Sequence, residues 1–403
     1  MNSVCVIGLG YIGLPTAALM ANRGLEVYGI DCVQSVVDTI NDGKIHIVEP
    51  GLAEFVKTAV ASGHLKASTT PVKAEAYIIA VPTPFVGNKI PDLSYVKAAS
   101  KEIAPFLQDE NLIVLESTSP VGTSEKVKEW ILEERPELVN LFVAHCPERV
   151  LPGKIIEELP TNDRIVGGIN KESTECARKF YEQFIDGNIL TTDARTAELT
   201  KLAENSFRDV NIAFANELSI ICEKLNINVW ELISLANRHP RVNILQPGPG
   251  VGGHCIAVDP WFIVDSAPDE SRLIKTARIV NDDKPSYVIR KVQEAANGFS
   301  NPRIACLGLA FKPDIDDLRE SPSMAIVQKL SKMSIGQLLV SEPNVKSLPT
   351  KLAGFKNIEF MNHTEAIDKA DIVLILVDHK EIKSLPKDVL KDKIVIDTRG
   401  VFA

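Results

Sequence analysis

The chain has 403 residues, of which 45% are hydrophobic and 24% charged, proportions ordinary for a folded globular protein of about two or three domains. The formal net charge of −9 argues against general binding to nucleic acid or to an anionic membrane surface, so an anionic ligand would need local Arg and Lys side chains. The seven scattered cysteines include no C-x-x-C pair, which argues against a disulfide framework or a zinc site and predicts a reducing, cytoplasmic environment.

The first half of the chain alternates short apolar runs with helical stretches, and it opens at MNSVCVIGLG without the features of a signal peptide. Strands are predicted at 4–8, 25–31, 76–81, 111–117, 141–146, 164–169 and 188–192. Helices are predicted between them, for example at 11–23, 121–134 and 171–186. This alternation favours a parallel sheet with helices on both faces. No run approaches the roughly 18 apolar residues that span a bilayer, so we expect no membrane segment.

The middle of the chain is predicted to be helical. Residues 193–225 contain neither Gly nor Pro, and apolar residues recur there every three or four positions, which predicts one helix of about 30 residues. Further helices are predicted at 229–237 and 271–296. Helices of such length commonly connect domains or build a subunit interface.

Beyond a linker at 297–302 the alternation of strands and helices resumes. Strands are predicted at 303–311, 336–343, 371–379 and 393–400, with a helix at 322–333. This pattern predicts a second, smaller α/β domain. Because it weakly repeats the first domain, a duplicated architecture is one interpretation.

The segment VCVIGLGYIGLP places Gly8, Gly10 and Gly13 between a predicted strand and a predicted helix. In such a turn the first glycine permits the bend, the second lets the backbone approach a pyrophosphate, and the third lets helix and strand pack closely. Asp31 ends the next strand, where a carboxylate accepts hydrogen bonds from the adenosine ribose and repels a 2′-phosphate. We therefore predict an NAD site; the alternative is a glycine turn without a ligand.

Two later strand ends should face the same cofactor, because ligands of parallel sheets lie at the carboxyl ends of the strands. They are AVPTP, which contains Thr83, and ESTSPVG, which contains Thr118. Each hydroxyl could equally cap the helix that follows it.

The long predicted helix carries Lys201, Asn205 and Arg208 on one face, at spacings of four and three residues. An ammonium, an amide and a guanidinium together suit an oxyanion and a phosphate or sugar hydroxyl. The simpler interpretation is a solvated helix surface, because Lys and Arg are usually exposed.

Two further charged segments could serve the same chemistry. In HCPERV, Glu148 could act as a base or position a water molecule, and Arg149 could pair with an anion. In RHPRVN, His239 and Arg241 lie beside the glycine-rich GPGVGG, a plausible phosphate cradle. Ordinary loop charges remain the alternative.

Cys255 lies in GPGVGGHCIAVDP, directly after His254. A free cysteine is usually a small apolar filler, but a glycine-rich loop is a poor place for one. No second Cys/His pair has suitable spacing for a metal, so we predict no metal site. The remaining interpretation is a nucleophile whose thiolate is favoured by a cation such as Lys201.

A nucleophilic cysteine has a particular meaning beside NAD. An alcohol is oxidised to an aldehyde, the thiol traps the aldehyde as a thiohemiacetal, a second hydride leaves to a second NAD, and the thioester is hydrolysed to a carboxylate. Oxidation of an alcohol to an aldehyde or ketone alone would need no cysteine.

With these motifs, the chain resembles the UDP-sugar 6-dehydrogenases of the UDP-glucose/GDP-mannose dehydrogenase family over essentially its whole length. The shared motifs are GLGYIGLP, VPTP, ESTSPVG, CPERVLPG, LTKLAENSFRDVNIAFANE, GVGGHCIAVDP and GLAFKPDIDDLRESP. Within that family, ENSFRDVNIAFANELS and NRHPRVNILQPGPGVGGHCIAVDPWF look most similar to bacterial UDP-N-acetyl-D-mannosamine dehydrogenases.

The resemblance implies an α/β fold of two Rossmann-like, doubly wound domains joined by a long central helix and a helical domain. It implies an NAD-binding part at 1–192, a central dimerisation part at 193–298 and a UDP-sugar-binding part at 299–403. It also implies a cytoplasmic homodimer or larger homo-oligomer that binds NAD and a UDP-sugar. We expect no nucleic-acid and no membrane partner.

The resemblance also assigns site residues by their positions in the motifs. It implies Cys255 as the nucleophile, Lys201 as the residue that exchanges a proton or stabilises the oxyanion, and Asn205 as a residue that assists that stabilisation. It implies Glu148 and Asp259 as residues that activate or order water. Cofactor contacts are implied at Gly8, Gly10, Tyr11, Ile12, Gly13, Asp31, Thr83, Thr118 and Arg319. Substrate contacts are implied at Arg149, Val150, Lys201, Asn205, Arg208, His239, Arg241, Gly252, Phe311, Lys312 and Arg399.

Together these features predict NAD-dependent, four-electron oxidation of UDP-N-acetyl-D-mannosamine at C6 to the uronic acid, for surface polysaccharides such as enterobacterial common antigen. One alternative is the same chemistry on UDP-glucose, UDP-N-acetylglucosamine or a UDP-galactose derivative. A second alternative is a two-electron β-hydroxyacid dehydrogenase, which would not need Cys255. A third is a non-catalytic protein that binds NAD.

Overall fold

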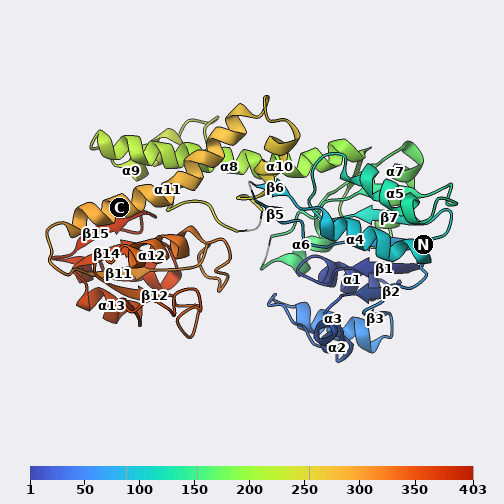
Figure 1. The fold of residues 1–403 in the computed structure, drawn as a ribbon, viewed down its shortest axis with the longest axis horizontal. Coiled ribbons are helices and arrows are strands. Elements are labelled where there is room, and N and C mark those ends of the chain that lie inside the picture. The colour runs from blue at the N-terminus through green and yellow to red at the C-terminus, as the bar shows by residue number, and fades with distance from the viewer. Residues whose placement is uncertain (88, 152, 254, 403) are drawn as a thin grey trace. The chain divides into compact units, whose positions relative to one another are not determined.

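The computed structural model of the protein describes residues 1–87, 89–151, 153–253 and 255–402 (Figure 1). The chain divides into two compact units. The N-terminal unit comprises Met1–Glu204 and Trp261–Ser266, and the C-terminal unit comprises Asn205–Pro260 and Ala267–Ala403. None of the helices in the described residues is long and apolar enough to cross a membrane.

The N-terminal unit is built on an eight-stranded sheet in the order β10-β9-β8-β7-β4-β1-β2-β3. Its strands are β1 (Ser3–Ile7), β2 (Glu26–Ile30), β3 (Leu65–Ser68), β4 (Ala76–Ile79), β7 (Leu112–Leu115), β8 (Phe142–His145), β9 (Arg164–Gly168) and β10 (Ile189–Asp193). The first six strands along the chain follow the order of a dinucleotide-binding fold, in which the chain reverses direction across the sheet between β1 and β4. The glycine turn that begins at Gly8 follows β1 at this switch point.

The prediction of a parallel sheet is wrong for two strands. β9 pairs antiparallel with β8, with Gly168 opposite Ala144, and β10 runs parallel to β9. An antiparallel neighbour needs no helix that crosses the sheet, and between β8 and β9 lies only the short α6 (Ile155–Thr161). The first domain is therefore a parallel sheet extended by a reversed pair.

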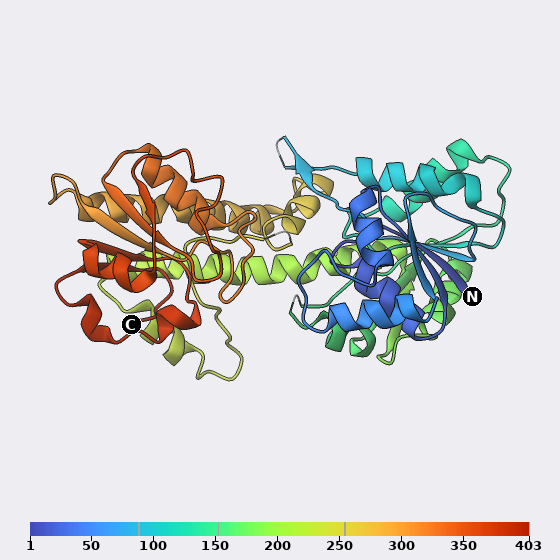
Figure 2. The same cartoon turned by 90° about the horizontal axis from the view of Figure 1, so that it is seen from below.

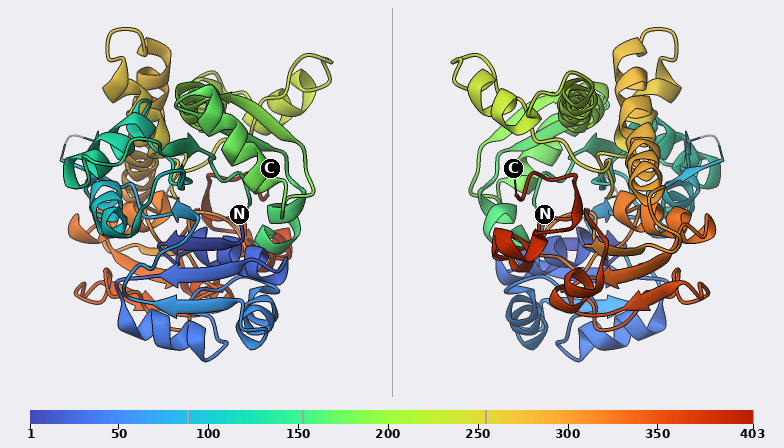
Figure 3. Two further views of the ribbon diagram at one scale, coloured as in Figure 1. Left: turned by 90° about the vertical axis from the view of Figure 1, so that its right-hand side faces the viewer. Right: turned by 90° about the vertical axis from the view of Figure 1, so that its left-hand side faces the viewer.

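Helices cover both faces of this sheet (Figure 3). Alternate residues of β1 point to opposite faces: Val4 and Val6 join one core, and Cys5 and Ile7 the other. The first core is covered by α1 (Gly13–Asn22), α3 (Leu52–Ala61), α6 and α7 (Lys171–Tyr181), and the second by α4 (Ser94–Ile103), η1 (Ala104–Phe106) and α5 (Thr123–Glu134). α2 (Gln34–Asn41) packs beside β3, and β5 (Phe85–Val86) and β6 (Ile90–Pro91) form a small hairpin.

The long central helix predicted at 193–225 is α8 (Ala194–Lys224), which begins in the N-terminal unit and ends in the C-terminal unit. It is followed by α9 (Val229–Ala236), α10 (Asp259–Ser266) and α11 (Arg272–Ala296). Within the C-terminal unit, α8 and α11 lie side by side (Figure 2), joined by buried polar side chains. Asn281 donates to Asp209 at 2.8 Å and accepts from Asn216 at 2.8 Å.

The C-terminal unit contains a second, fully parallel sheet in the order β13-β12-β11-β14-β15. Its strands are β11 (Arg303–Leu307), β12 (Gln337–Ser341), β13 (Ile358–Phe360), β14 (Ile372–Ile375) and β15 (Ile394–Asp397). α11 and α12 (Pro322–Lys332) pack on one face, and α13 (His363–Lys369) and α14 (Lys380–Lys383) pack on the other; η2 (Lys387–Leu390) lies beside α13. The fold is therefore α/β, with two doubly wound sheets of matching order around their switch points.

Candidate active site

Two glycines of the turn after β1 are required by packing. Gly8 has φ of 93°, and a Cβ there would lie 2.7 Å from the Ala80 carbonyl oxygen. A Cβ at Gly13 would lie 1.8 Å from the carbonyl oxygen of Gly8. Gly10, in contrast, has no heavy atom within 4 Å of a Cβ, so its missing side chain leaves open space on the ligand side of the turn.

The neighbouring groups suit a dinucleotide. Asp31 is half-buried and accepts the backbone N–H of Leu9 at 3.1 Å and of Val33 at 3.0 Å. No side chain caps the start of α1, whose N-cap position is Ile12, and the adjacent Tyr11 is exposed. An uncapped helix N-terminus attracts a pyrophosphate, so these residues fit an NAD molecule held with its ribose toward Asp31.

The predicted pair Thr83 and Thr118 is brought together at the ends of β4 and β7. The Thr83 hydroxyl donates to the Thr118 carbonyl at 2.6 Å. Ser117 makes a matching bond to the Val81 carbonyl at 2.6 Å. The two loops are therefore joined into one edge above the switch point.

At the end of β8, Glu148 is buried and forms an ion pair with Arg164, Oε2 to Nη1 at 2.5 Å. Its other oxygen accepts the Arg149 backbone N–H at 2.6 Å. The Arg149 guanidinium forms an ion pair with Glu204 on α8 at 2.7 Å, and the next residue, Val150, packs against the core. Breaking a buried pair such as Glu148–Arg164 costs roughly 3–5 kcal/mol, so Arg164 holds Glu148 firmly in place.

His145 and Lys201 also lie near each other in the N-terminal unit. Burial lowers the pKa of His145 to about 3, and the positive charge of Lys201 adds to this effect. His145 is fully buried, while Lys201 is half-buried on α8. The ring of His145 is therefore neutral at physiological pH.

Asn205 and Asp259 are in direct contact. The Asn205 Nδ2 donates to the Asp259 Oδ2 at 2.5 Å, and both side chains are buried. Asp259 begins α10, and its backbone N–H donates to the Cys255 carbonyl at 2.8 Å. The Cys255 side chain is exposed, so its position in the turn before α10 agrees with a reactive thiol and not with a core filler.

The glycines ahead of Cys255 are needed for close packing within the C-terminal unit. A Cβ at Gly252 would lie 2.4 Å from the Glu320 carbonyl oxygen, and one at Gly253, where φ is 85°, would lie 3.0 Å from the Phe311 ring. The GPGVGG segment is thus braced against the GLAFKP and DDLRESP motifs. His254 lies outside the described residues.

The remaining predicted contacts differ in exposure. Arg208, His239, Arg241 and Lys312 are exposed. Arg399 is largely buried: its Nε donates to the Leu376 carbonyl at 3.0 Å, and its guanidinium lies against Gly248. Arg319, predicted to contact the cofactor, forms a bidentate ion pair with Asp317 at 2.9 and 2.7 Å.

Several buried side chains that hydrogen-bond to these loops were not predicted from the sequence. Arg278 on α11 is 1% exposed and pairs with Asp209 at 2.5 Å, and its Nη1 lies 3.5 Å from the Ile256 carbonyl, next to Cys255. Glu49 accepts the N–H groups of Gly153 and Ile155, at 2.9 and 2.8 Å. No sequence signal separates these from surface charges, because their partners lie far along the chain.

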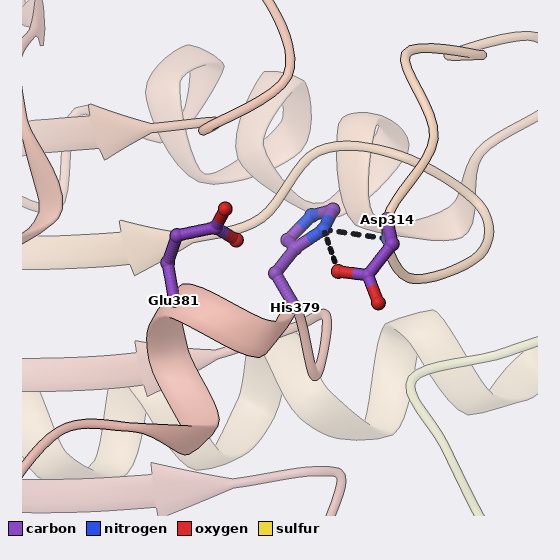
Figure 4. Close-up of side chains that lie close together, drawn as sticks. All are labelled: Asp314, His379 and Glu381. Atoms are coloured by element: carbon purple, nitrogen blue, oxygen red, sulfur yellow. Dashed lines mark hydrogen bonds and ion pairs between the residues drawn. The ribbon is translucent and has the colours of Figure 1, made fainter.

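One group in the described residues has the composition of a metal site: Asp314, His379 and Glu381, whose ligand atoms lie within 4.8 Å of one another (Figure 4). However, Nδ1 of His379 accepts the Asp314 backbone N–H at 3.0 Å, and Nε2 lies 3.1 Å from Glu342. Both ring nitrogens are thereby engaged with protein groups. His379 therefore belongs to a hydrogen-bond network of the loop with Asp314 and Glu342.

A glycine turn followed by a half-buried carboxylate at one switch point, together with a second doubly wound sheet, defines the class: an NAD-dependent dehydrogenase with two Rossmann-like domains. The chain belongs to the UDP-glucose/GDP-mannose dehydrogenase family. The family's NAD binding domain matches residues 2–185, its central domain residues 195–283 and its UDP binding domain residues 305–403. The resemblance drawn from the motifs is confirmed, and so is the NAD cofactor.

Three similar proteins illustrate the relationship. The UDP-N-acetyl-D-mannosamine dehydrogenase of Campylobacter jejuni is 58% identical over 96% of this chain and 98% of its own length. The NDP-N-acetyl-D-galactosaminuronic acid dehydrogenase of Ralstonia nicotianae is 57% identical over 100% of this chain and 96% of its own length. A solved UDP-D-ManNAc dehydrogenase from Pyrococcus horikoshii is 36% identical, covers 100% of this chain and 96% of its own, and superposes with a TM-score of 0.90.

Proposed function

We propose that the protein oxidises UDP-N-acetyl-D-mannosamine at C6 to the uronic acid, in two NAD-dependent steps through a covalent intermediate on Cys255. The observation that carries this proposal is the exposed thiol of Cys255 in the turn before α10. The Cys255 carbonyl accepts the backbone N–H of Asp259, whose side chain is bonded to Asn205. A two-electron dehydrogenase would have no use for such a thiol.

The residues of the chain would divide the chemistry as follows. Bound NAD supplies the hydride acceptor for both oxidations. The O6 proton passes to water as the first hydride leaves C6, and the Lys201 ammonium is the group we assign to stabilising the negative charge that develops on O6. The Cys255 thiolate then adds to the resulting aldehyde. One N–H of Asn205 is directed to Asp259, and the second is the donor we assign to the thiohemiacetal oxyanion.

A second hydride then leaves the same carbon, and a thioester remains. Water attacks this carbonyl, the carbon–sulfur bond breaks, and the thiolate of Cys255 leaves as the carboxylate forms. The buried Glu148 and Asp259 carboxylates are the groups we assign to ordering that water molecule. Two hydrides leave per sugar, so two NADH form.

The substrate contacts are proposed from charge and position. In a protein with a net charge of −9, the diphosphate needs local cations, and Arg208, Arg241 and Lys312 are exposed cations on motif segments. Arg149, Val150, His239, Gly252, Phe311 and Arg399 complete the proposed set. For Arg149, whose guanidinium is paired with Glu204, we assign the contact to its backbone.

The sugar itself is proposed from relatives. Relatives from Campylobacter jejuni and Escherichia coli, at 58% and 54% identity, are named UDP-N-acetyl-D-mannosamine dehydrogenases. The Ralstonia relative, at 57%, is named for an N-acetyl-D-galactosaminuronic acid, so an N-acetylgalactosamine nucleotide is the second candidate. Either product is an acidic sugar of the kind used in surface polysaccharides.

The test is a panel of UDP-sugars with NADH counted per sugar consumed. UDP-N-acetyl-D-mannosamine is expected to yield two NADH at the highest kcat/KM. A yield of one would reject the four-electron mechanism, and a preference for UDP-N-acetyl-D-galactosamine would replace the substrate. Cys255→Ala is expected to lower turnover roughly a thousandfold or more, whereas Cys176→Ser on α7 should leave it unchanged.

We further infer a cytoplasmic homodimer formed through the central part, residues 193–298, with NAD bound by 1–192 and the UDP-sugar by 299–403. Within the C-terminal unit, α8 exposes Phe207, Phe214 and Ile221, at spacings of seven residues and exposures of 71%, 51% and 44%. Such a stripe on a long helix is typical of a helix–helix interface. Phe214→Asp should halve the mass in solution, measured by light scattering, while Glu217→Gln on the same helix should not.

A further inference from the structure

The turn after β11 in the C-terminal unit is held by a buried carboxylate. Glu342 follows β12 and is 3% exposed. Its Oε2 accepts the backbone N–H groups of Leu309 at 2.7 Å and Ala310 at 3.0 Å, and it lies 3.1 Å from Nε2 of His379. Burial by itself would raise the pKa of Glu342, but the hydrogen bonds from His379 and Leu309 outweigh it and lower the pKa, so the group is ionised.

His379 connects Glu342 to the far end of the loop, at Asp314. Its ring is fully buried, and Nδ1 accepts the Asp314 backbone N–H at 3.0 Å (Figure 4). Because a backbone amide can only donate, Nδ1 acts as the acceptor, and Nε2 carries the ring proton that is donated to Glu342. The Asp314 carboxylate in turn accepts the Lys380 N–H at 2.9 Å.

The segment between these two anchors carries Phe311 and Lys312. The Phe311 N–H donates to the Asp317 carbonyl at 3.3 Å, and its ring lies against Gly253 in the loop that precedes Cys255. Glu342 already takes the amides of Leu309 and Ala310, which a phosphate would take in a dinucleotide-binding turn. A diphosphate at this loop must therefore be met by side chains, and their position depends on the anchors.

We propose that the buried Glu342–His379 pair is the positioning unit of the UDP-sugar loop, and that it sets the affinity for the uridine diphosphate moiety without acting on NAD. This inference rests on the proposed function of Phe311 and Lys312 as substrate contacts. The pair touches no reacting atom; it acts through the backbone of residues 309–314.

Three substitutions of His379 separate the contributions of its two hydrogen bonds, one to Glu342 and one to the Asp314 backbone. His379→Gln places an amide nitrogen near the position of Nε2 and keeps the donor to Glu342. His379→Asn places an oxygen near Nδ1 and keeps the acceptor for Asp314. Each is expected to weaken UDP binding roughly fivefold, the loss of one hydrogen bond, and His379→Ala tenfold or more. Glu381→Gln, in the same cluster, is the matched control.

The measurements are the calorimetric Kd for UDP and for NADH, and the KM values of both substrates. Support is a rise in the UDP Kd and in the UDP-sugar KM, with kcat changed less than threefold and the NADH Kd unchanged. The proposal is overturned if His379→Ala and both isosteric variants keep wild-type UDP affinity, or if UDP and NADH affinity fall together. UDP binding requires no oxidation, so a wild type that binds UDP but fails to form two NADH would reject the proposed function alone.

Discussion

The two sheets share one backbone turn but use it differently. After β1, Gly8 has φ of 93° and its N–H donates to Ile30 at 2.8 Å; after β11, Gly308 has φ of 92° and its N–H donates to Ser341 at 2.8 Å. The residue that follows the second strand is acidic in both: Asp31 is half-buried, and Glu342 is buried by His379. The same backbone turn can therefore bind the ribose of a dinucleotide only where the carboxylate after the second strand stays accessible, as Asp31 does.

The helices that follow the two turns also differ in whether a side chain caps their N-terminus. α1 has no side-chain cap, whereas α12 is capped by Ser321, whose hydroxyl accepts the Met324 N–H at 3.2 Å and donates to the Leu309 carbonyl at 2.6 Å. In the N-terminal unit the start of α1 has no side-chain cap and Asp31 is only half-buried, so these groups are accessible to a ligand. In the C-terminal unit the polar groups of the switch point are hydrogen-bonded to other groups of the protein. A ligand there must therefore be bound by side chains.

The largest expected effect comes from adding a Cβ to the first glycine of each turn, after β1 and after β11. Gly8→Ala would place a Cβ 2.7 Å from the Ala80 carbonyl oxygen, and Gly308→Ala would place one 2.4 Å from Cβ of Val377, both at positive φ. Gly8→Ala is expected to weaken NADH binding more than tenfold and to leave UDP binding intact, and Gly308→Ala to do the reverse. Calorimetric titration of both ligands into both variants measures this.

Gly24→Ala is the control for backbone strain alone, because Gly24 has φ of 95° but no neighbour near a Cβ. If either switch-point variant lost both ligands equally, the two turns would not be independent sites. A thermal melt of each variant shows whether the unit remains folded.

The acidic residues provide the next contrast. Asp31→Ala is expected to raise the Kd of NAD about tenfold to a hundredfold, the value of hydrogen bonds to a charged group, and to reduce the preference over NADP. Glu342→Gln should leave both cofactor constants unchanged. Steady-state kinetics with NAD and NADP measures the preference, and an unaltered preference in Asp31→Ala would contradict the ribose assignment.

A pH experiment compares two buried carboxylates, one per unit. Glu116, after β7, is 2% exposed and bonded to the Tyr181 hydroxyl at 2.6 Å; burial raises its pKa to about 7, against the opposing charge of Arg164. A raised pKa means that the contribution of Glu116 to stability is full below pH 4.5 and is lost as the pH rises to about 7. Glu342 has a lowered pKa, so its contribution is present above pH 4.5 and is lost on acidification.

At pH 8, Glu116→Gln is therefore expected to raise the free energy of unfolding by about 1–3 kcal/mol, and Glu342→Gln to lower it. The difference for Glu116→Gln should shrink as the pH falls below about 7 and be lost by pH 4.5, whereas the difference for Glu342→Gln should shrink only on acidification below pH 4.5. Titration of His145 is common to all three proteins and cancels in the comparison. Denaturant unfolding at pH 4 and pH 8 tests the opposite signs, and like signs at pH 8 would refute the comparison.

The smallest effect is expected at the cap of α12. Ser321→Ala removes the cap and the bond to Leu309, and should lower the free energy of unfolding of the C-terminal unit by about 1–2 kcal/mol without changing the Kd of NADH. Ser384→Ala, at the end of α14, is the matched control and should cost little. A change in NADH affinity in Ser321→Ala would argue against independent switch points.

Most of the fold could be predicted from the sequence, because the elements are separated by strong local signals. The helix predicted at 193–225 is observed at Ala194–Lys224, since Gly and Pro are absent from it. The reversal of β9 and β10 could not be predicted. RIVGGI reads as a strand in either direction, and only the path of residues 146–163 decides how it pairs.

The site was predictable where a residue's role is set by its neighbours in sequence, as for Gly8 and Gly13. Contacts between distant segments were not. Arg278 reads as a helix-surface cation but is 1% exposed, because its partner Asp209 lies on another helix. The pairing of Glu148 with Arg164 was hidden for the same reason.

Finally, the N-terminus of α5 bears on where dissolved anions can bind to this acidic protein. Glu198 of α8 is fully buried and accepts the N–H groups of Gly122 and Ser124, at 2.6 and 2.8 Å, where α5 begins. A phosphate or sulfate ion from a buffer meets an occupied helix end there. The start of α1 has no side-chain cap, so an anion that binds there would compete with the pyrophosphate of the coenzyme. Buffer composition therefore belongs among the variables of every affinity measured on this enzyme.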